Sequence, residues 1–105
     1  MKIKGVQPAH IALILKHIKI VFPKAKIYAF GSRVRGAPRK YSDLDLALDN
    51  HKVLDLSKLF KLKEALSETN IPIVIDIIDY QSVSPTFKKI IDQQKMLLYE
   101  GGIKE

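Results

Sequence analysis

The chain has 105 residues, no cysteine and a formal net charge of +7 at pH 7. Its length predicts a single domain spanning residues 1–105, and the lack of cysteine excludes disulfides and thiolate metal sites. No apolar run approaches the roughly 18 residues that a membrane helix needs, and no secretory signal is visible, so we expect a cytoplasmic protein with no membrane partner. The positive charge favours partners that carry phosphate groups.

The predicted elements alternate between helix and strand. Apolar residues at three- and four-residue steps indicate helices, whereas short alternating or β-branched runs indicate strands. In chain order we expect a helix at 8–22, a strand at 26–30, a loop at 31–41, a strand at 43–49, a helix at 55–69, a strand at 71–79, a helix at 85–94 and a strand at 96–100. This order predicts one α/β domain.

Two of these strands carry acidic residues that could share a cation. Asp43 and Asp45 fall on one face of the strand at 43–49, about 7 Å apart along the chain. The alternative explanation is a solvent-exposed strand face, because two acids on the wet face of an edge strand are common. Asp76 interrupts a β-branched run that is typical of an interior strand, where a carboxylate costs several kcal/mol unless it is paired. It therefore either pairs with a lysine or joins Asp43 and Asp45 around Mg²⁺ or Mn²⁺.

The loop between the first two strands gathers the arginines of the chain. Arg33, Arg35 and Arg39 lie within seven residues, while the fifteen lysines are spread over the rest of the sequence. Arginine favours bidentate contact with phosphate oxygens, and the turn at Gly31 and Ser32 can offer N–H groups and a hydroxyl to a phosphate. Beside the carboxylates, this loop predicts two-metal phosphoryl or nucleotidyl transfer, with a chance surface loop as the alternative.

These residues resemble the signature of the DNA polymerase β-like nucleotidyltransferases, which is Gly-Ser, ten residues, then Asp-x-Asp. Gly31-Ser32 and Asp43-Leu44-Asp45 match it with the same spacing, and Asp76 corresponds to a third carboxylate on a later strand. The resemblance covers nearly the whole chain, and the length is similar to that of the minimal nucleotidyltransferases. It implies the nucleotidyltransferase fold, which is a small mixed sheet with helices packed on one side.

The resemblance also implies an activity and a partner. Minimal members are often encoded beside a helical HEPN protein, an RNase toxin that they silence by transferring AMP from ATP to a tyrosine. We therefore expect an Mg²⁺-dependent enzyme, with Mn²⁺ as the second choice of metal, that uses ATP and forms a hetero-oligomer with a HEPN-type protein. The implied catalytic and metal-binding residues are Asp43, Asp45 and Asp76, and the implied nucleotide-binding residues are Gly31, Ser32, Arg33 and Arg35.

Three alternatives stay open. The protein could be a non-catalytic antitoxin that blocks its partner sterically, or it could transfer a nucleotide to a small molecule or an RNA end. The charge of +7 also allows a small nucleic-acid-binding module. No aromatic stacking motif or recognition-helix signature accompanies that charge, so nucleic acid is the least favoured partner.

Overall fold

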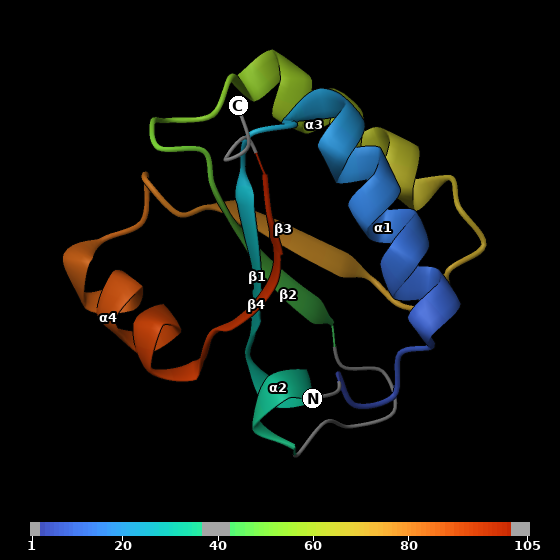
Figure 1. Ribbon diagram of the computed structural model, residues 1–105, viewed down its shortest axis with the longest axis horizontal. Coiled ribbons are helices and arrows are strands. Elements are labelled where there is room, and N and C mark those ends of the chain that lie inside the picture. The colour runs from blue at the N-terminus through green and yellow to red at the C-terminus, as the bar shows by residue number, and fades with distance from the viewer. Residues whose placement is uncertain (1–2, 37–42, 102–105) are drawn as a thin grey trace.

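The computed structural model describes residues 3–36 and 43–101, which form a four-stranded mixed sheet with helices on both faces (Figure 1). The strand order is β3-β2-β1-β4. Strand β1 is antiparallel to β2 and β4, whereas β2 and β3 are parallel. The elements are α1 (Pro8–Val21), β1 (Lys26–Phe30), α2 (Ser32–Arg35), β2 (Leu44–Asp49), α3 (Leu56–Ser67), β3 (Ile75–Asp79), α4 (Pro85–Gln94) and β4 (Met96–Glu100).

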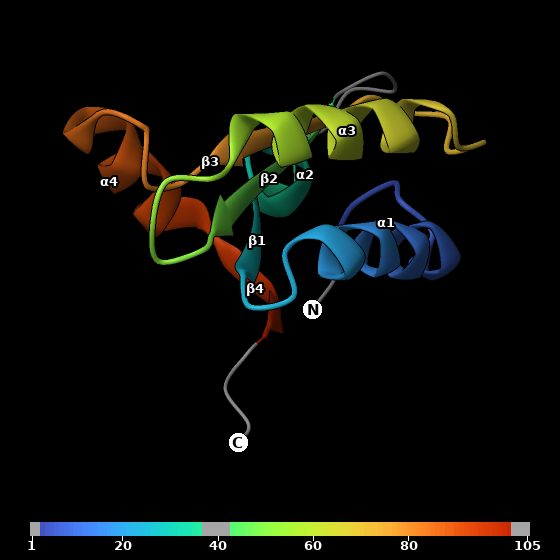
Figure 2. The ribbon, with the colours of Figure 1, turned by 90° about the horizontal axis from the view of Figure 1, so that it is seen from above.

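Helices α1 and α3 lie side by side over one face of the sheet and bury most of the core (Figures 1 and 2). The alternation of β2 explains this packing, because every second residue of a strand points to the same face. Leu44, Leu46 and Leu48 are fully buried on the helix side. The longest of the described helices has 14 residues, and none of them is long and apolar enough to cross a membrane.

Helix α4 lies on the other side of β1 and β4 from α1 (Figures 1 and 2). Its Ile91 is fully buried and packs with Phe30 and Ala47, which belong to the face of the sheet away from α1 and α3. The predicted mixed sheet is confirmed, and the predicted packing of helices on one side holds for α1 and α3. The second face is only partly covered, and Asp43 and Asp76 are exposed.

The structure differs from the prediction in two places. The expected loop at 31–41 contains a short helix, α2, and residues 37–41 of that loop lie outside the described residues. The expected interior strand at 71–79 is shorter and lies at the edge of the sheet. The helix starts are confirmed, since the Asp55 and Ser84 side chains accept hydrogen bonds from the amides of Lys58 and Phe87.

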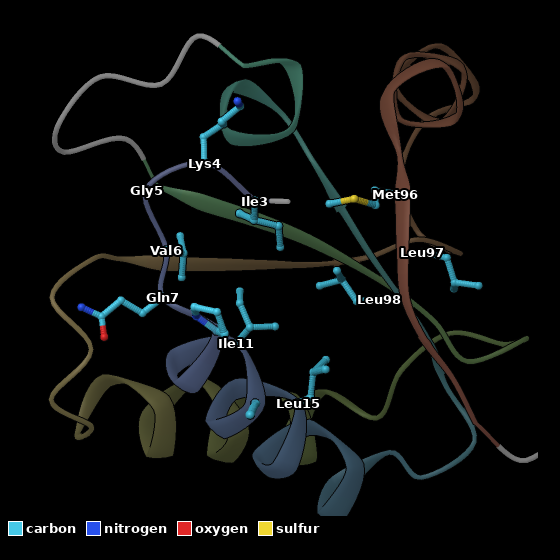
Figure 3. A pocket seen from close by; sticks show the side chains of 12 residues that line it. Ile3, Lys4, Gly5, Val6, Gln7, Ile11, Leu15, Met96, Leu97 and Leu98 are labelled. Carbon is cyan, nitrogen blue, oxygen red and sulfur yellow. The ribbon is translucent and has the colours of Figure 1, made fainter. Parts of the chain in front are cut away.

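A groove of about 860 Å³ lies on the side of the sheet where α1 packs, between α1 and β4 (Figure 3). Its lining is mostly apolar, and it includes none of the residues predicted to bind nucleotide or metal. Met96 and Leu98 point toward this groove, whereas Leu97 points away from it (Figure 3). Because the acidic residues lie on the opposite face of the sheet, the groove is separate from the candidate active site.

Candidate active site

The register of β2 and β3 places Asp45 beside Asp76. The two residues are Cα partners in the parallel pairing of these strands, so their side chains point to the same face of the sheet. Asp43 lies immediately before β2, and its charge acts on Asp45. Asp45 is half-buried, whereas the other two side chains are exposed. The three predicted carboxylates therefore lie close together.

Asp76 lies in a different environment from the one that its sequence predicts. We expected an interior strand in which a buried carboxylate would be costly, but β3 is an edge strand and Asp76 is exposed. Leaving a carboxylate in water costs little. Asp76 therefore meets Asp45 because of strand register, and the predicted burial of Asp76 is wrong.

The electrostatics of the three carboxylates favour a cation. Burial raises the pKa of Asp45, and the neighbouring charges of Asp76 and Asp43 raise it further. Among residues 3–36 and 43–101, no three acidic or histidine side chains are already arranged as a metal cage. The oxygen-only donor set suits Mg²⁺ or Mn²⁺, because a divalent ion would offset the repulsion that raises this pKa. Asp43, Asp45 and Asp76 are the residues that fit such an ion.

The raised pKa of Asp45 has a consequence for stability. The pKa of the Asp45 carboxyl is higher in the folded protein than in the unfolded chain. The free energy of unfolding therefore falls as the pH rises from below the unfolded-state pKa through the folded-state pKa. We expect Asp45→Asn to raise the melting temperature at neutral pH by a few degrees at most, since about 1 kcal/mol corresponds to roughly 4–8 °C in a domain of this size. The gain should vanish below pH 3. Thermal melts of both proteins from pH 3 to 8 would measure this gain. If Asp45→Asn melts at a lower temperature than the unmodified protein at pH 7, repulsion between the carboxylates does not destabilise the fold.

Gly31 brings the start of α2 against this site. Its φ is +85°, a left-handed conformation that side-chain-bearing residues rarely adopt. A Cβ atom added to Gly31 would clash with Oδ2 of Asp45, so the glycine backbone and the carboxylate are in close approach. Ser32 follows as the first residue of α2. The structure therefore brings Gly31 and Ser32 together with Asp45, as the sequence motif predicts.

Gly31→Ala is expected to destabilise the fold by about 1–3 kcal/mol, because it adds backbone strain and displaces the Asp45 carboxylate. Gly36→Ala is the matched control. Gly36 also has a positive φ, +92°, but a Cβ there would meet only the end of the Lys4 side chain at 3.9 Å. We expect this control to cost about 1 kcal/mol, from backbone strain alone. Urea unfolding of both variants measures the difference, and equal losses would show that the contact with Asp45 is unimportant.

The arginines have different positions. Arg33 is only 3% exposed, and its Nη1 donates a hydrogen bond of 2.7 Å to the carbonyl oxygen of Lys4. The Lys4 amide in turn donates to the Arg33 carbonyl at 3.0 Å, so α2 is fastened to the N-terminal segment. Arg35 is exposed at the end of α2, and Arg39 lies outside the described residues. Arg33 therefore has a structural contact that the sequence did not reveal, while Arg35 is accessible to a ligand.

Two further aspartates on these strands stabilise turns. Asp79 accepts hydrogen bonds from the Leu54 amide at 2.9 Å and from the Ser82 hydroxyl at 2.7 Å. Asp49 accepts hydrogen bonds from the Gln81 side chain and the His51 amide. Burial opposes the ionisation of Asp49, but these hydrogen bonds outweigh it and lower its pKa. Both residues are held in turns and lie away from the Asp45–Asp76 pair.

The structure also adds a residue that the sequence did not single out. Gln94, the last residue of α4, accepts a hydrogen bond of 3.0 Å from the Gly31 amide through its Oε1 atom. The two residues are 63 positions apart, and no local pattern links a glutamine at a helix end to a glycine after a strand. Only the pairing of β4 with β1 brings them together.

The mixed sheet, the Gly-Ser turn and the adjacent carboxylates together define a nucleotidyltransferase type of protein, and a comparison with family models agrees. The model described as "Polymerase beta, Nucleotidyltransferase" matches residues 12–102. The chain belongs to this family and is a nucleotidyltransferase. In Haemophilus influenzae, a relative described as "Probable protein adenylyltransferase MntA" is 35% identical over 95 residues, which cover 90% of this chain and 83% of the relative.

Solved structures show the same fold. A chain in a crystal structure of a toxin–antitoxin with AMP-PNP has a TM-score of 0.73 and 26% identity, covering 86% of this chain and 73% of that one. A chain from the complex of a tri-AMPylated Shewanella oneidensis HEPN toxin with its MNT antitoxin has a TM-score of 0.68 and 26% identity, covering 88% of this chain and 71% of that one.

Proposed function

We propose that this protein transfers AMP from ATP to a hydroxyl group of a HEPN-type toxin and thereby acts as its antitoxin. The observation that carries the proposal is the alignment of Asp45 with Asp76 beside Gly31, which joins the carboxylates to the Gly-Ser turn. The similarity to proteins described as an adenylyltransferase and as parts of toxin–antitoxin complexes supports the choice of AMP and of the partner. In this proposal residues 1–105 act as one minimal domain in the cytoplasm.

The transfer breaks a phosphoanhydride bond of ATP and forms a phosphodiester bond to the acceptor. The acceptor oxygen forms a bond to the α-phosphorus of ATP, the bond from that phosphorus to the bridging oxygen breaks, and pyrophosphate leaves. The proton of the acceptor hydroxyl passes to a base, and exposed Asp76 is our candidate, because it lies beside Asp45 at the open edge of the sheet. The role of the other residues is to position the reactants.

Asp43, Asp45 and Asp76 would hold Mg²⁺, or Mn²⁺ in its place. When bound, such an ion supplies charge that stabilises the phosphate oxygens and favours the attacking alkoxide. Gly31 and Ser32 orient the triphosphate next to the carboxylates, and exposed Arg35 is available to its outer phosphates. Arg33 contributes by fixing α2 to the N-terminal segment through Lys4.

Two samples of labelled ATP test the proposal. We expect ATP labelled at the α-phosphate to label the HEPN-type partner in the presence of Mg²⁺, and ATP labelled at the γ-phosphate not to label it. Label from the γ-phosphate would indicate a kinase reaction. Neutralisation of the partner without any transfer would instead favour an antitoxin that acts sterically.

A further inference from the structure

The hydrogen bond between Gln94 and Gly31 follows from how β4 joins the sheet. Met96 pairs with Ala29 in the antiparallel register of β4 and β1. Continuing this register by two residues from that pair sets Gln94 opposite Gly31. The carboxamide oxygen of Gln94 then accepts the Gly31 amide at 3.0 Å in a partly buried position. The last residue of α4 thus contacts the first residue of the nucleotidyltransferase motif.

The C-terminal turn of α4 is firmly held on the sheet, so Gln94 has a defined place. Ile91, one turn earlier, is fully buried against Phe30 and Ala47. Lys95, the next residue, places its ammonium group 4.7 Å from the Tyr28 ring centre and makes an ion pair of 2.9 Å with Asp92. These contacts lie on both sides of Gln94 in the sequence and limit its movement.

Gly31 is therefore fixed from two directions. Gln94 holds its amide, and the Asp45 carboxylate lies where a Cβ atom would be. The Gly31 carbonyl also accepts hydrogen bonds from the amides of Val34 and Arg35 at 3.1 and 3.0 Å, but its amide side is held by Gln94. Glycine at a φ of +85° has no side chain to restrict its backbone further. Removing either contact should let the turn sample other conformations.

We propose that Gln94 is a positioning residue for nucleotide binding. Its side chain holds the Gly31 amide and keeps the Gly31–Ser32 turn against Asp45 in the conformation that accepts the triphosphate. The effect on AMP transfer rests on the proposed function, whereas the effects on the Gly31 amide and on nucleotide affinity do not.

The test compares Gln94→Met with Gln93→Met. Met has nearly the length and helix propensity of Gln but lacks the carbonyl oxygen, and Gln93 is the exposed neighbour in the same helix. We expect Gln94→Met to speed hydrogen exchange of the Gly31 amide, measured by NMR, and to weaken binding of Mg²⁺–AMP-PNP about fivefold, the effect of losing one hydrogen bond. Gln93→Met should change neither. Gln94→Glu keeps an acceptor oxygen and should restore slow exchange.

Each outcome decides the proposal. Equal exchange of the Gly31 amide in Gln94→Met and Gln93→Met would overturn it, as would faster exchange with unchanged AMP-PNP affinity. Tighter AMP-PNP binding by Gln94→Met would also overturn it, because Gln94 would then compete with the phosphates for the Gly31 amide. If the expected changes occur but the unmodified protein transfers no AMP to its partner, the proposed function fails and the role of Gln94 stands.

Discussion

The double substitution Asp43→Asn with Asp45→Asn is expected to slow AMP transfer by roughly a thousandfold or more. Asp45 is the partner of Asp76 in the strand register, and the charge of Asp43 acts on Asp45. Neutral amides are poor ligands for a divalent cation. Without the charge that such an ion supplies, the developing charge on the phosphate oxygens loses its main stabilisation. Initial rates of label transfer from ATP to the partner, at saturating ATP and Mg²⁺, measure the effect.

Asp49→Asn is the matched control, because Asp49 lies on the same face of the same strand. It belongs to a turn with Gln81 and His51, and an asparagine oxygen can still accept one of those hydrogen bonds. We expect its rate to stay within about threefold of the unmodified protein. Circular dichroism should show that all variants are folded. A double variant at Asp43 and Asp45 that transfers AMP as fast as the control would exclude these residues from catalysis.

Asp76→Asn is expected to slow AMP transfer about a hundredfold without lowering the free energy of unfolding. The side chain is exposed on the edge strand and lies beside Asp45, so its removal relieves repulsion and breaks no packing. The loss of one metal ligand and candidate base should appear mainly in kcat, since these act on the bond-forming step. Steady-state kinetics and urea unfolding of the same sample measure both quantities.

The opposite behaviour is expected of Asp79→Asn. Asp79 accepts hydrogen bonds from Leu54, Gln81 and Ser82, so this variant should lose about 1 kcal/mol of stability and keep most of its kcat. The two aspartates are three residues apart, on β3 and at its end. If both variants lose activity in proportion to stability, Asp76 has only a structural role.

Local patterns predicted the elements well where the signal was strong. The strands at Lys26–Phe30 and Met96–Glu100 have the bounds that the sequence predicted, and β2 begins at Leu44, one residue later than predicted. Strand order is set by pairing between distant segments, which no local pattern contains. A β-branched run such as β3 fits an edge strand with one apolar face as well as an interior strand. For this reason the prediction that Asp76 lies in an interior strand was wrong.

The contacts that hold the Gly-Ser turn could not be predicted from the sequence. Arg33 has the residue type of a phosphate ligand, and only the fold shows its guanidinium group bonded to the carbonyl of Lys4. Helix α2 has four residues, too few for any periodicity to reveal it. Gln94 reaches Gly31 across a strand pairing. The motif therefore predicted the candidate site residues, and only the tertiary structure shows which other residues contact them.

We propose that this protein attaches AMP to a hydroxyl of a HEPN-type toxin as its partner. The decisive measurement is the intact mass of the purified partner after incubation with this protein, ATP and Mg²⁺. We expect the partner to gain one or more AMP units, to gain none when EDTA replaces Mg²⁺, and to gain none with the double variant at Asp43 and Asp45. An unchanged partner mass, with the toxin still neutralised, would contradict the claim.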